Sequence, residues 1–251
     1  MGKDRFTGRT AFITGAAQGM GLRLALDMAG EGARVTISDI DEGELARAGE
    51  ELSKTGSPFL ALRCDVSRRA ELEVAMDRTL EAFGCLDILV NNAGLLVPAS
   101  IEDTTDELID RTLDINVKGA LYAIRHVTPV MKERGWGRII NVASIAGKNG
   151  DNSTNFSYGA SKGALISLTR STARQLGPFG ITCNAIAPHA VMTRMMEYWD
   201  DGKKAAAAAL IPVRRLGTVE DMSSLMMFLA SAESGFINGE TININGGYYM
   251  D

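Results

Sequence analysis

Residues 10–21 of the chain read TAFITGAAQGMG. The first five are β-branched or apolar and predict a short buried strand, and the three glycines that follow have the spacing G-x-x-x-G-x-G. Gly15 allows a tight turn, Gly19 lets backbone amides approach a ligand, and Gly21 lets a following helix pack closely against the strand. The N-terminus of that helix presents unpaired N–H groups and a positive dipole end, which favour phosphate. These residues therefore predict a strand–turn–helix unit that binds the pyrophosphate of a dinucleotide.

The rest of the chain alternates short apolar runs with longer helical patterns. The further predicted strands are residues 34–38, 59–63, 87–90, 138–142, 181–186 and 241–244, and the predicted helices are residues 20–29, 41–54, 68–83, 105–134, 158–176 and 219–230. The strands are continuous apolar runs, which is typical of a parallel sheet covered by helices on both faces. We therefore expect an α/β protein, a single doubly wound Rossmann domain over residues 1–251 with a seven-stranded parallel sheet. A Met- and Ala-rich insertion at about residues 191–212 breaks the alternation and predicts a small helical substrate lid.

Composition and charge agree with one globular domain and exclude several classes of partner. The chain has 251 residues, of which 45% are hydrophobic and 23% charged, close to the usual averages. Its 26 basic and 31 acidic residues give a formal net charge of −5. The basic residues are scattered along the chain, so nucleic acids and membrane surfaces are not expected partners.

Cysteine usage and the absence of long apolar runs indicate a cytoplasmic protein. Cys64, Cys85 and Cys183 lie far apart and the chain has two histidines, so we expect no metal site and buried, reduced thiols. The N-terminus carries no apolar run typical of a signal peptide, and no window approaches the roughly 18 apolar residues of a membrane span.

Asp39 is the residue that predicts the type of dinucleotide. It stands at the end of the second predicted strand, about 20 positions after the glycine-rich turn. A carboxylate at this place accepts hydrogen bonds from the ribose hydroxyls of NAD and repels the 2′-phosphate of NADP. Gln18, Ser38 and Ile40 supply no basic side chain that would reverse the preference. The expected cofactor is therefore NAD.

Tyr158, Lys162 and Ser144 predict acid–base chemistry. Tyr158 and Lys162 are four residues apart at the start of a predicted helix, so they share one face. A tyrosine with its ordinary pKa of about 10 is a poor base near neutrality, and a lysine cation beside it favours the phenolate. Ser144 follows the fifth predicted strand and reaches the carboxyl-end edge of the sheet, where open α/β sheets bind their ligands.

These motifs resemble those of the short-chain dehydrogenase/reductase family over essentially the whole chain. They occur in the family's order: Thr14 to Gly21, Asp65-Val66, Asn91-Asn92-Ala93-Gly94, Asn116, Ser144, Tyr158-x-x-x-Lys162, and Pro188 to Thr193. The resemblance implies an NAD-dependent dehydrogenase of secondary alcohols that reduces the ketone in the reverse direction. Hydride would pass between the carbinol carbon and the nicotinamide, while Tyr158 exchanges the hydroxyl proton and Ser144 hydrogen-bonds the substrate oxygen.

The resemblance also implies the residues that bind the cofactor. Lys162 would bind the nicotinamide ribose, and Asn116 would hold a water that links Lys162 to solvent. Asp65 and Val66 would hold the adenine, Asn92 and its neighbours would line the adenine ribose, and Val191 and Thr193 would contact the nicotinamide amide and the phosphates. The expected catalytic set is Asn116, Ser144, Tyr158 and Lys162, and the expected cofactor set is Gly15, Gln18, Gly19, Met20, Gly21, Asp39, Ile40, Asp65, Val66, Asn92, Ala93, Gly94, Tyr158, Lys162, Pro188, Val191 and Thr193.

Two places depart from the family's usual pattern, and both concern the substrate. The chain has Pro188-His189 where the family usually has Pro-Gly, and His189 either contacts substrate or faces solvent. The loop between Ser144 and Tyr158 is polar and one residue longer than the common spacing. Lys148 in this loop is a candidate for binding an acidic substrate, as are Arg194 and Arg214, but surface placement is the commoner fate of such residues.

The family resemblance also implies an oligomeric state and leaves other functions to be compared with the dehydrogenase. Relatives commonly form tetramers, so we expect a homotetramer in which residues 246–251 can reach the pocket of another subunit. A 3-oxoacyl-thioester reductase that prefers NADP is the main alternative. Epimerases and dehydratases with the same Tyr/Lys pair generally have a larger C-terminal substrate domain, and a non-catalytic NAD(H) sensor would be expected to lose the pair. The intact Tyr158 and Lys162 favour the dehydrogenase.

Overall fold

The computed structural model describes residues 4–150, 155–193 and 199–251 of the chain. In this part of the chain seven strands form one sheet in the order β3-β2-β1-β4-β5-β6-β7, and each neighbouring pair is parallel. The strands are β1 (Thr10–Thr14), β2 (Arg34–Asp39), β3 (Phe59–Arg63), β4 (Ile88–Asn91), β5 (Gly137–Val142), β6 (Ile181–Pro188) and β7 (Thr241–Ile244). The predicted doubly wound parallel sheet is therefore confirmed. The strand order reverses between β1 and β4, and such a switch point opens a crevice for a ligand.

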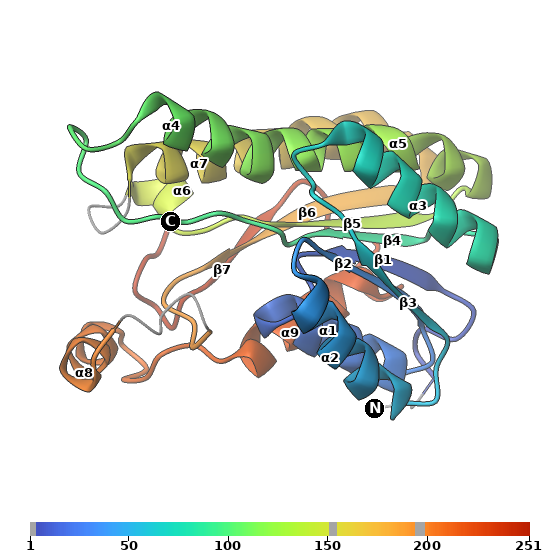
Figure 1. Ribbon diagram of the computed structural model, residues 1–251, viewed down its shortest axis with the longest axis horizontal. Coiled ribbons are helices and arrows are strands. Elements are labelled where there is room, and N and C mark those ends of the chain that lie inside the picture. The colour runs from blue at the N-terminus through green and yellow to red at the C-terminus, as the bar shows by residue number, and fades with distance from the viewer. Residues whose placement is uncertain (1–3, 151–154, 194–198) are drawn as a thin grey trace.

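Helices cover both faces of the sheet, as the continuous apolar strands predict (Figure 1). One face carries α1 (Gly19–Gly30), α2 (Glu42–Ser53) and α9 (Val219–Ala230), and the other carries α3 (Arg69–Phe83), α4 (Asp106–Leu113), α5 (Gly119–Arg134) and α7 (Phe156–Leu176). Two further helices, α6 (Ala146–Asn149) and α8 (Asp201–Leu210), follow β5 and β6 and lie at the left of the view. A 3₁₀ turn over Gly177–Phe179 leads into β6. No described helix is long and apolar enough to cross a membrane.

Each face of the sheet buries its own apolar layer. Between the sheet and α1, α2 and α9 lie Leu24, Met28, Leu52, Met222 and Met226. Between the sheet and α3, α5 and α7 lie Leu72, Met76, Val127, Met131 and Leu176. The three cysteines are buried, as expected. Two apolar layers hold the strands rigidly, so the loops at their carboxyl ends have a fixed support.

The long helical region predicted over residues 105–134 is not one regular helix. A π-helical turn over Asp114–Lys118 separates α4 from α5. Asn116 lies in this turn and is 1% exposed. Its side chain bonds to the backbone of Leu95, with Leu95 N donating to Oδ1 at 2.7 Å and Nδ2 donating to Leu95 O at 3.0 Å. The local pattern does not encode this turn, because it depends on a partner 21 residues away.

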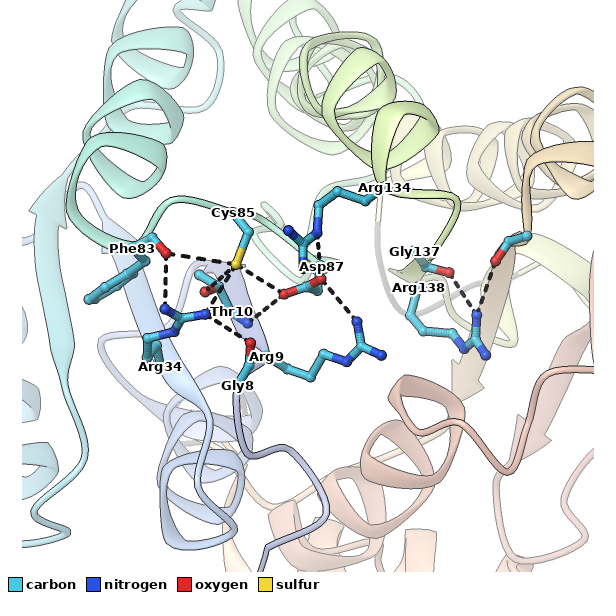
Figure 2. Close-up of polar contacts among 11 residues, drawn as sticks. Gly8, Arg9, Thr10, Arg34, Phe83, Cys85, Asp87, Arg134, Gly137 and Arg138 are labelled. Carbon is cyan, nitrogen blue, oxygen red and sulfur yellow. Dashed lines mark hydrogen bonds and ion pairs between the residues drawn. The ribbon is translucent and has the colours of Figure 1, made fainter.

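A polar network closes the amino-terminal edge of the sheet (Figure 2). The carboxylate of Asp87, which is 0% exposed, accepts hydrogen bonds from Thr10 N at 3.0 Å, Arg9 Nη1 at 3.1 Å and Arg134 Nε at 3.2 Å. The Cys85 thiol donates to the same carboxylate at 3.3 Å. These contacts tie the starts of β1 and β4 to the last turn of α5. This end of the sheet is consequently occupied by structural contacts, and the opposite end carries the cleft.

Candidate active site

A cleft of about 610 Å³ lies at the carboxyl ends of the strands, at the edge where the sequence predicted the ligand. Nine of the predicted site residues line it: Met20, Asn92, Gly94, Ser144, Tyr158, Lys162, Pro188, Val191 and Thr193. The others do not line the cleft itself. Gly15, Gln18, Gly19, Gly21, Asp39, Ile40, Asp65, Val66 and Ala93 follow β1 to β4 at the same edge of the sheet, and Asn116 is buried in its π-helical turn.

The glycine-rich turn is shaped by close contacts with the loop after β4. Gly15 has φ +61°, and a Cβ on it would lie 2.7 Å from the Cα of Ala93. Asn92 Nδ2 donates to the carbonyl oxygens of Gly15 at 2.7 Å and Thr14 at 2.9 Å. A Cβ on Gly21 would lie 2.7 Å from the same amide nitrogen. Asn92 thus stabilises the turn. This contact joins the glycine-rich turn to the Asn91–Gly94 motif and is not visible in either motif alone.

The start of α1 fits the phosphates of a dinucleotide. Within the described residues, α1 has no acidic side chain in its first turn and no side-chain hydrogen bond at its N-cap. Among the described residues, a Cβ on Gly19 would meet only the side chain of Thr193, its methyl group at 3.7 Å and its Cβ at 3.9 Å, so a ligand can approach the backbone there. An uncapped helix start with open backbone suits an anion. The residues present therefore fit a pyrophosphate group.

Asp39 lies directly beside this turn. Its Oδ2 accepts a hydrogen bond from Ala17 N at 3.2 Å, and its Oδ1 accepts one from Ile40 N at 2.8 Å. Oδ1 also accepts a hydrogen bond from Asp41 N at 3.3 Å. A carboxylate has about four acceptor sites, so one is left for a ligand. This placement agrees with a ribose-binding role.

Asp65 and Val66 have structural contacts of their own. Asp65 Oδ1 accepts hydrogen bonds from Ser67 N at 3.0 Å and Ser67 Oγ at 2.6 Å, in the turn that leads to α3. Val66 is 8% exposed, and a Cβ on Gly119 would lie 3.1 Å from its Cβ. Their adenine contacts stay a prediction.

Tyr158 and Lys162 lie in the first turns of α7, which begins two residues before the predicted start. Asn155 caps the helix, its Oδ1 accepting a hydrogen bond from Tyr158 N at 3.0 Å. Lys162 Nζ donates to the carbonyl oxygen of Val142, at the end of β5, at 2.7 Å. It lies 5.6 Å from the centroid of the Tyr158 ring. Burial lowers the pKa of Lys162 to about 8, because an ammonium group loses its hydration there.

Ser144 and Asn116 complete the predicted set in different ways. Ser144 lines the cleft, and its Oγ accepts a hydrogen bond from Ala146 N at 3.1 Å. Asn116 Nδ2 donates to Ser161 Oγ at 3.0 Å as well as to Leu95, and Ser161 Oγ donates to Tyr158 O at 2.7 Å. Both hydrogens of the Asn116 amide are thus engaged by protein groups. The water-binding role implied for Asn116 is untested by these contacts.

Gly94 lies between Asn116 and Lys162. A Cβ on Gly94 would lie 3.4 Å from Lys162 Nζ and 3.6 Å from Asn116 Oδ1. Glycine therefore keeps the approach between the two polar groups clear of side-chain atoms.

The substrate end of the cleft contains a residue that the sequence did not single out. Tyr248 lines the cleft of its own chain and stacks on His189, with ring centroids 3.9 Å apart and an interplanar angle of 18°. The expectation that residues 246–251 can reach another subunit's pocket stays a prediction. The surface placement expected for Lys148 is wrong, because its side chain is 9% exposed and pairs with Asp251. No local pattern marks Tyr248, because the folding back of the C-terminal segment alone brings it to the cleft.

The insertion at 191–212 contributes Val191, Thr193, Trp199, Ala207 and Leu210 to the cleft. Met195, Met196 and Tyr198 of this insertion, and the candidate anion ligand Arg194, lie outside the described residues. The described residues contain no cluster of three His, Cys, Asp or Glu side chains that could hold a metal ion.

A glycine-rich turn at the switch point of a parallel sheet, together with a Tyr–Lys pair in the adjoining cleft, defines a dinucleotide-dependent oxidoreductase. Comparison with known proteins agrees. Residues 15–249 match the family described as enoyl-(acyl carrier protein) reductase. Galactitol 2-dehydrogenase of Agrobacterium fabrum (strain C58) is 41% identical over 98% of this chain and 99% of that protein.

A second relative and a solved structure are also similar to this chain. The 3-oxoacyl-(acyl-carrier-protein) reductase of Staphylococcus aureus (strain Mu50) is 35% identical over 96% of this chain and 98% of that protein. A crystal structure of a short-chain type dehydrogenase/reductase from Mycobacterium marinum matches with a TM-score of 0.93 at 31% identity, over 99% of this chain and 98% of that one. The chain belongs to the short-chain dehydrogenase/reductase family. It is an oxidoreductase that acts on CH–OH groups with a nicotinamide cofactor.

Proposed function

We propose that the protein is an NAD-dependent dehydrogenase of secondary alcohols, with Tyr158 as the acid–base residue. The observation that carries the proposal is the arrangement of one cleft. Tyr158, Lys162 and Ser144 line it, and the turn of Gly15 to Gly21 with Asp39 lies at the same edge of the sheet. A hydroxyl group bound at Ser144 is then within the same cleft as the residues expected to bind the nicotinamide, Val191 and Thr193.

The chain's own residues move the proton. The Lys162 ammonium, 5.6 Å from the ring centroid of Tyr158, favours the phenolate form of the tyrosine. The phenolate accepts the proton of the substrate hydroxyl, and the Ser144 hydroxyl donates a hydrogen bond to the oxygen as charge develops on it. Bound NAD supplies the hydride acceptor. In the reverse direction Tyr158 returns the proton to the alkoxide oxygen.

Lys162 is also proposed to pass a proton onward. Gly94 keeps the space between Lys162 Nζ and Asn116 Oδ1 open, with an added Cβ lying 3.4 Å and 3.6 Å from these atoms. We assign Asn116 a positioning role on two grounds: it ties the loop at Leu95 to α7 through Ser161, and it faces the space beside Lys162.

The test combines turnover with cofactor binding. The wild-type enzyme is expected to form NADH from NAD with members of a panel of secondary alcohols, followed by absorbance. Tyr158→Phe removes the proton acceptor and is expected to reduce kcat at least about a thousandfold, while NADH binding measured by fluorescence stays within about threefold. Turnover by Tyr158→Phe near the wild-type rate would contradict the proposal.

A second candidate is an NADP-preferring 3-oxoacyl-thioester reductase, favoured by the likeness to the reductase of S. aureus. Asp39, whose carboxylate lies beside the glycine-rich turn, opposes it. Oxidation of NADPH by an acetoacetyl thioester, with kcat/KM above that of every NAD-dependent alcohol oxidation, would establish this alternative.

We also propose a cytoplasmic homotetramer. The three free, buried cysteines suit a reducing compartment. Exposed apolar side chains on the outer helices, Leu121 of α5 at 43% and Phe156 of α7 at 48% exposure, suit an interface with another copy of the chain. The segment with α8 keeps the role of substrate lid as part of the proposal.

A further inference from the structure

We propose that His189 and Tyr248 form a specificity-determining pair: His189 binds a second hydroxyl group next to the reacting carbon of the substrate, and Tyr248 holds the imidazole in place. The preferred substrates are then neutral vicinal diols or polyols. This inference rests on the proposed alcohol dehydrogenase function and names the substrate class of the same cleft.

The backbone brings His189 next to the reacting position. His189 directly follows Pro188, the last residue of β6. The carbonyl oxygen of Pro188 accepts a hydrogen bond from Ile145 N at 3.0 Å, and Ile145 directly follows Ser144. Both His189 and Ser144 line the cleft. A substrate whose reacting oxygen is bound by Ser144 and Tyr158 therefore shares the cleft with the imidazole.

The stacked geometry orients the imidazole without using its nitrogens. The two ring centroids are 3.9 Å apart and the rings are 18° from parallel. Stacking uses the faces of the rings, whereas the imidazole nitrogens form hydrogen bonds in the ring plane. Tyr248 thus restricts the plane in which the edge of the imidazole forms hydrogen bonds.

A turn in the C-terminal segment positions Tyr248. Asn245 Nδ2 donates to Tyr249 O at 2.9 Å, and Tyr248 N donates to Asn245 O at 3.2 Å. Gly246 presses this turn against the segment after α8, since a Cβ there would lie 2.6 Å from side-chain carbons of Ile211 and Val213. The turn therefore packs on the connection that leaves the proposed lid.

Asp251 ties the C-terminal segment to α6, whose residues Ala146 and Asn149 line the cleft. Asp251 Oδ2 pairs with Lys148 Nζ at 2.6 Å, and its Oδ1 accepts a hydrogen bond from Asn243 Nδ2 at 2.6 Å. Lys148 Nζ also donates to Thr241 O at 3.2 Å. Lys148 belongs to α6, which lies between Ser144 and Tyr158, and Figure 1 shows the C-terminus beside this helix. The segment that carries Tyr248 is thus held on both sides.

The charge of the cleft agrees with a neutral, hydroxylated substrate. Among the described residues that line it, Lys162 is the only Lys, Arg, Asp or Glu side chain, and it is committed to Tyr158 and Val142 O. The polar groups at the substrate end are Ser144, Asn149, His189, Trp199 and Tyr248. Such groups pair well with hydroxyls and leave a carboxylate or phosphate without a counter-charge.

The test compares two substrates that differ by one hydroxyl group, butane-2,3-diol and butan-2-ol, with NAD as cofactor. For the wild type we expect kcat/KM for the diol to exceed that for the mono-ol about tenfold, as one good hydrogen bond allows. His189→Leu is expected to bring the ratio close to one, because the loss falls mainly on kcat/KM for the diol. Tyr248→Leu is expected to lower the ratio in the same direction, and Tyr248→Phe, which keeps the ring, to retain it.

Controls separate a specific effect from a structural one. Met250→Ala alters an exposed residue of the same segment, 78% exposed, and is expected to leave the ratio unchanged. The double variant of His189→Leu and Tyr248→Leu is expected to lower the ratio no further than His189→Leu, because both changes remove one interaction. Equal losses for diol and mono-ol, or a wild-type ratio near one, would overturn the inference and leave the dehydrogenase function standing. Absence of NADH formation with every secondary alcohol would instead overturn the proposed function, and the inference with it.

Discussion

The position of the Asp39 carboxylate predicts whether the protein uses NAD or NADP. It lies at the end of β2 with its oxygens against Ala17 N at 3.2 Å and Ile40 N at 2.8 Å. Since the glycine-rich turn holds it there, a 2′-phosphate would approach a fixed negative charge.

We therefore expect a higher kcat/KM with NAD than with NADP. Asp39→Asn removes the charge and is expected to lower kcat/KM with NAD about tenfold, in line with the loss of a charged hydrogen-bond acceptor, and to raise it with NADP. Steady-state kinetics with both cofactors is the measurement. Glu42→Gln, three residues away and exposed, is the control and should change neither. A wild-type preference for NADP would be incompatible with this assignment.

Lys162 predicts a pH dependence of stability. Its pKa in the folded protein is lowered to about 8, below the roughly 10.4 of an exposed lysine, because it is buried. Between these values the unfolded chain binds more protons than the folded one, so this residue's contribution to stability increases as pH rises.

Lys162→Met removes the titrating group. We expect the wild type to gain stability relative to Lys162→Met as the pH is raised from 8 to 10, measured by urea unfolding at each pH. Curves for the two proteins that stay parallel over this range would show that the lysine does not titrate there.

At the scale of elements, the N-terminus of α7 is what places the proposed acid–base pair. Asn155 Oδ1 accepts a hydrogen bond from Tyr158 N at 3.0 Å, and Asn155 Nδ2 donates to Val97 O at 2.6 Å. One side chain thus caps α7 and ties it to the loop after β4.

Substitutions of Asn155 separate these two tasks. Asn155→Ala is expected to lower the free energy of unfolding by about 1 kcal/mol, the usual loss for an N-cap, and to reduce kcat. Asn155→Ser keeps a cap acceptor and loses the donor to Val97 without burying a charge, so it should retain more of the stability. Thermal unfolding and kinetics on the three proteins are the measurement, and identical behaviour of both variants would contradict the division of tasks.

Element-level prediction succeeded where the pattern is local and failed where it is not. The bounds of β1, β3, β7 and α9 agree with the residues expected from periodicity. The turn at Asp114–Lys118 does not follow from periodicity, because the bonds of Asn116 to Leu95 and Ser161 come from distant segments.

At the scale of the whole molecule, the two ends of the sheet have different tasks. The amino-terminal edge is closed by Asp87 and its partners (Figure 2), and the carboxyl edge carries the cleft. Asp87 is 0% exposed, whereas the side chains of Arg9 and Arg134 are 32% and 40% exposed.

Asp87→Asn is expected to lower the free energy of unfolding by about 3 kcal/mol, because a buried carboxylate loses its charge-assisted bonds. The kcat/KM of the folded enzyme should stay within about twofold, since the change is at the edge away from the cleft. Asp77→Asn, which breaks the exposed pair with His126, is the matched control and should cost less than about 1 kcal/mol. Equal losses in both variants would show that the network is not a structural centre.

We expect four copies of the chain to form a tetramer in solution. Light scattering is expected to give four times the 26.8 kDa of one chain. A monomer in solution would refute the tetramer and would leave the chemistry of the cleft unaffected.

The amino-acid sequence by itself determines those features whose residues are close in the sequence or lie at the ends of strands. The turn of Gly15 to Gly21, Asp39 and the Tyr158–Lys162 pair are of this kind, because a parallel sheet brings the carboxyl ends of its strands to one edge whatever the loops do. Three contacts depend on the tertiary structure instead. They are the hydrogen bonds of the buried Asn116 side chain, the Lys148–Asp251 ion pair and the His189–Tyr248 stack. They join segments separated by many residues, and no local periodicity records them, so packing of the complete chain is what brings them together.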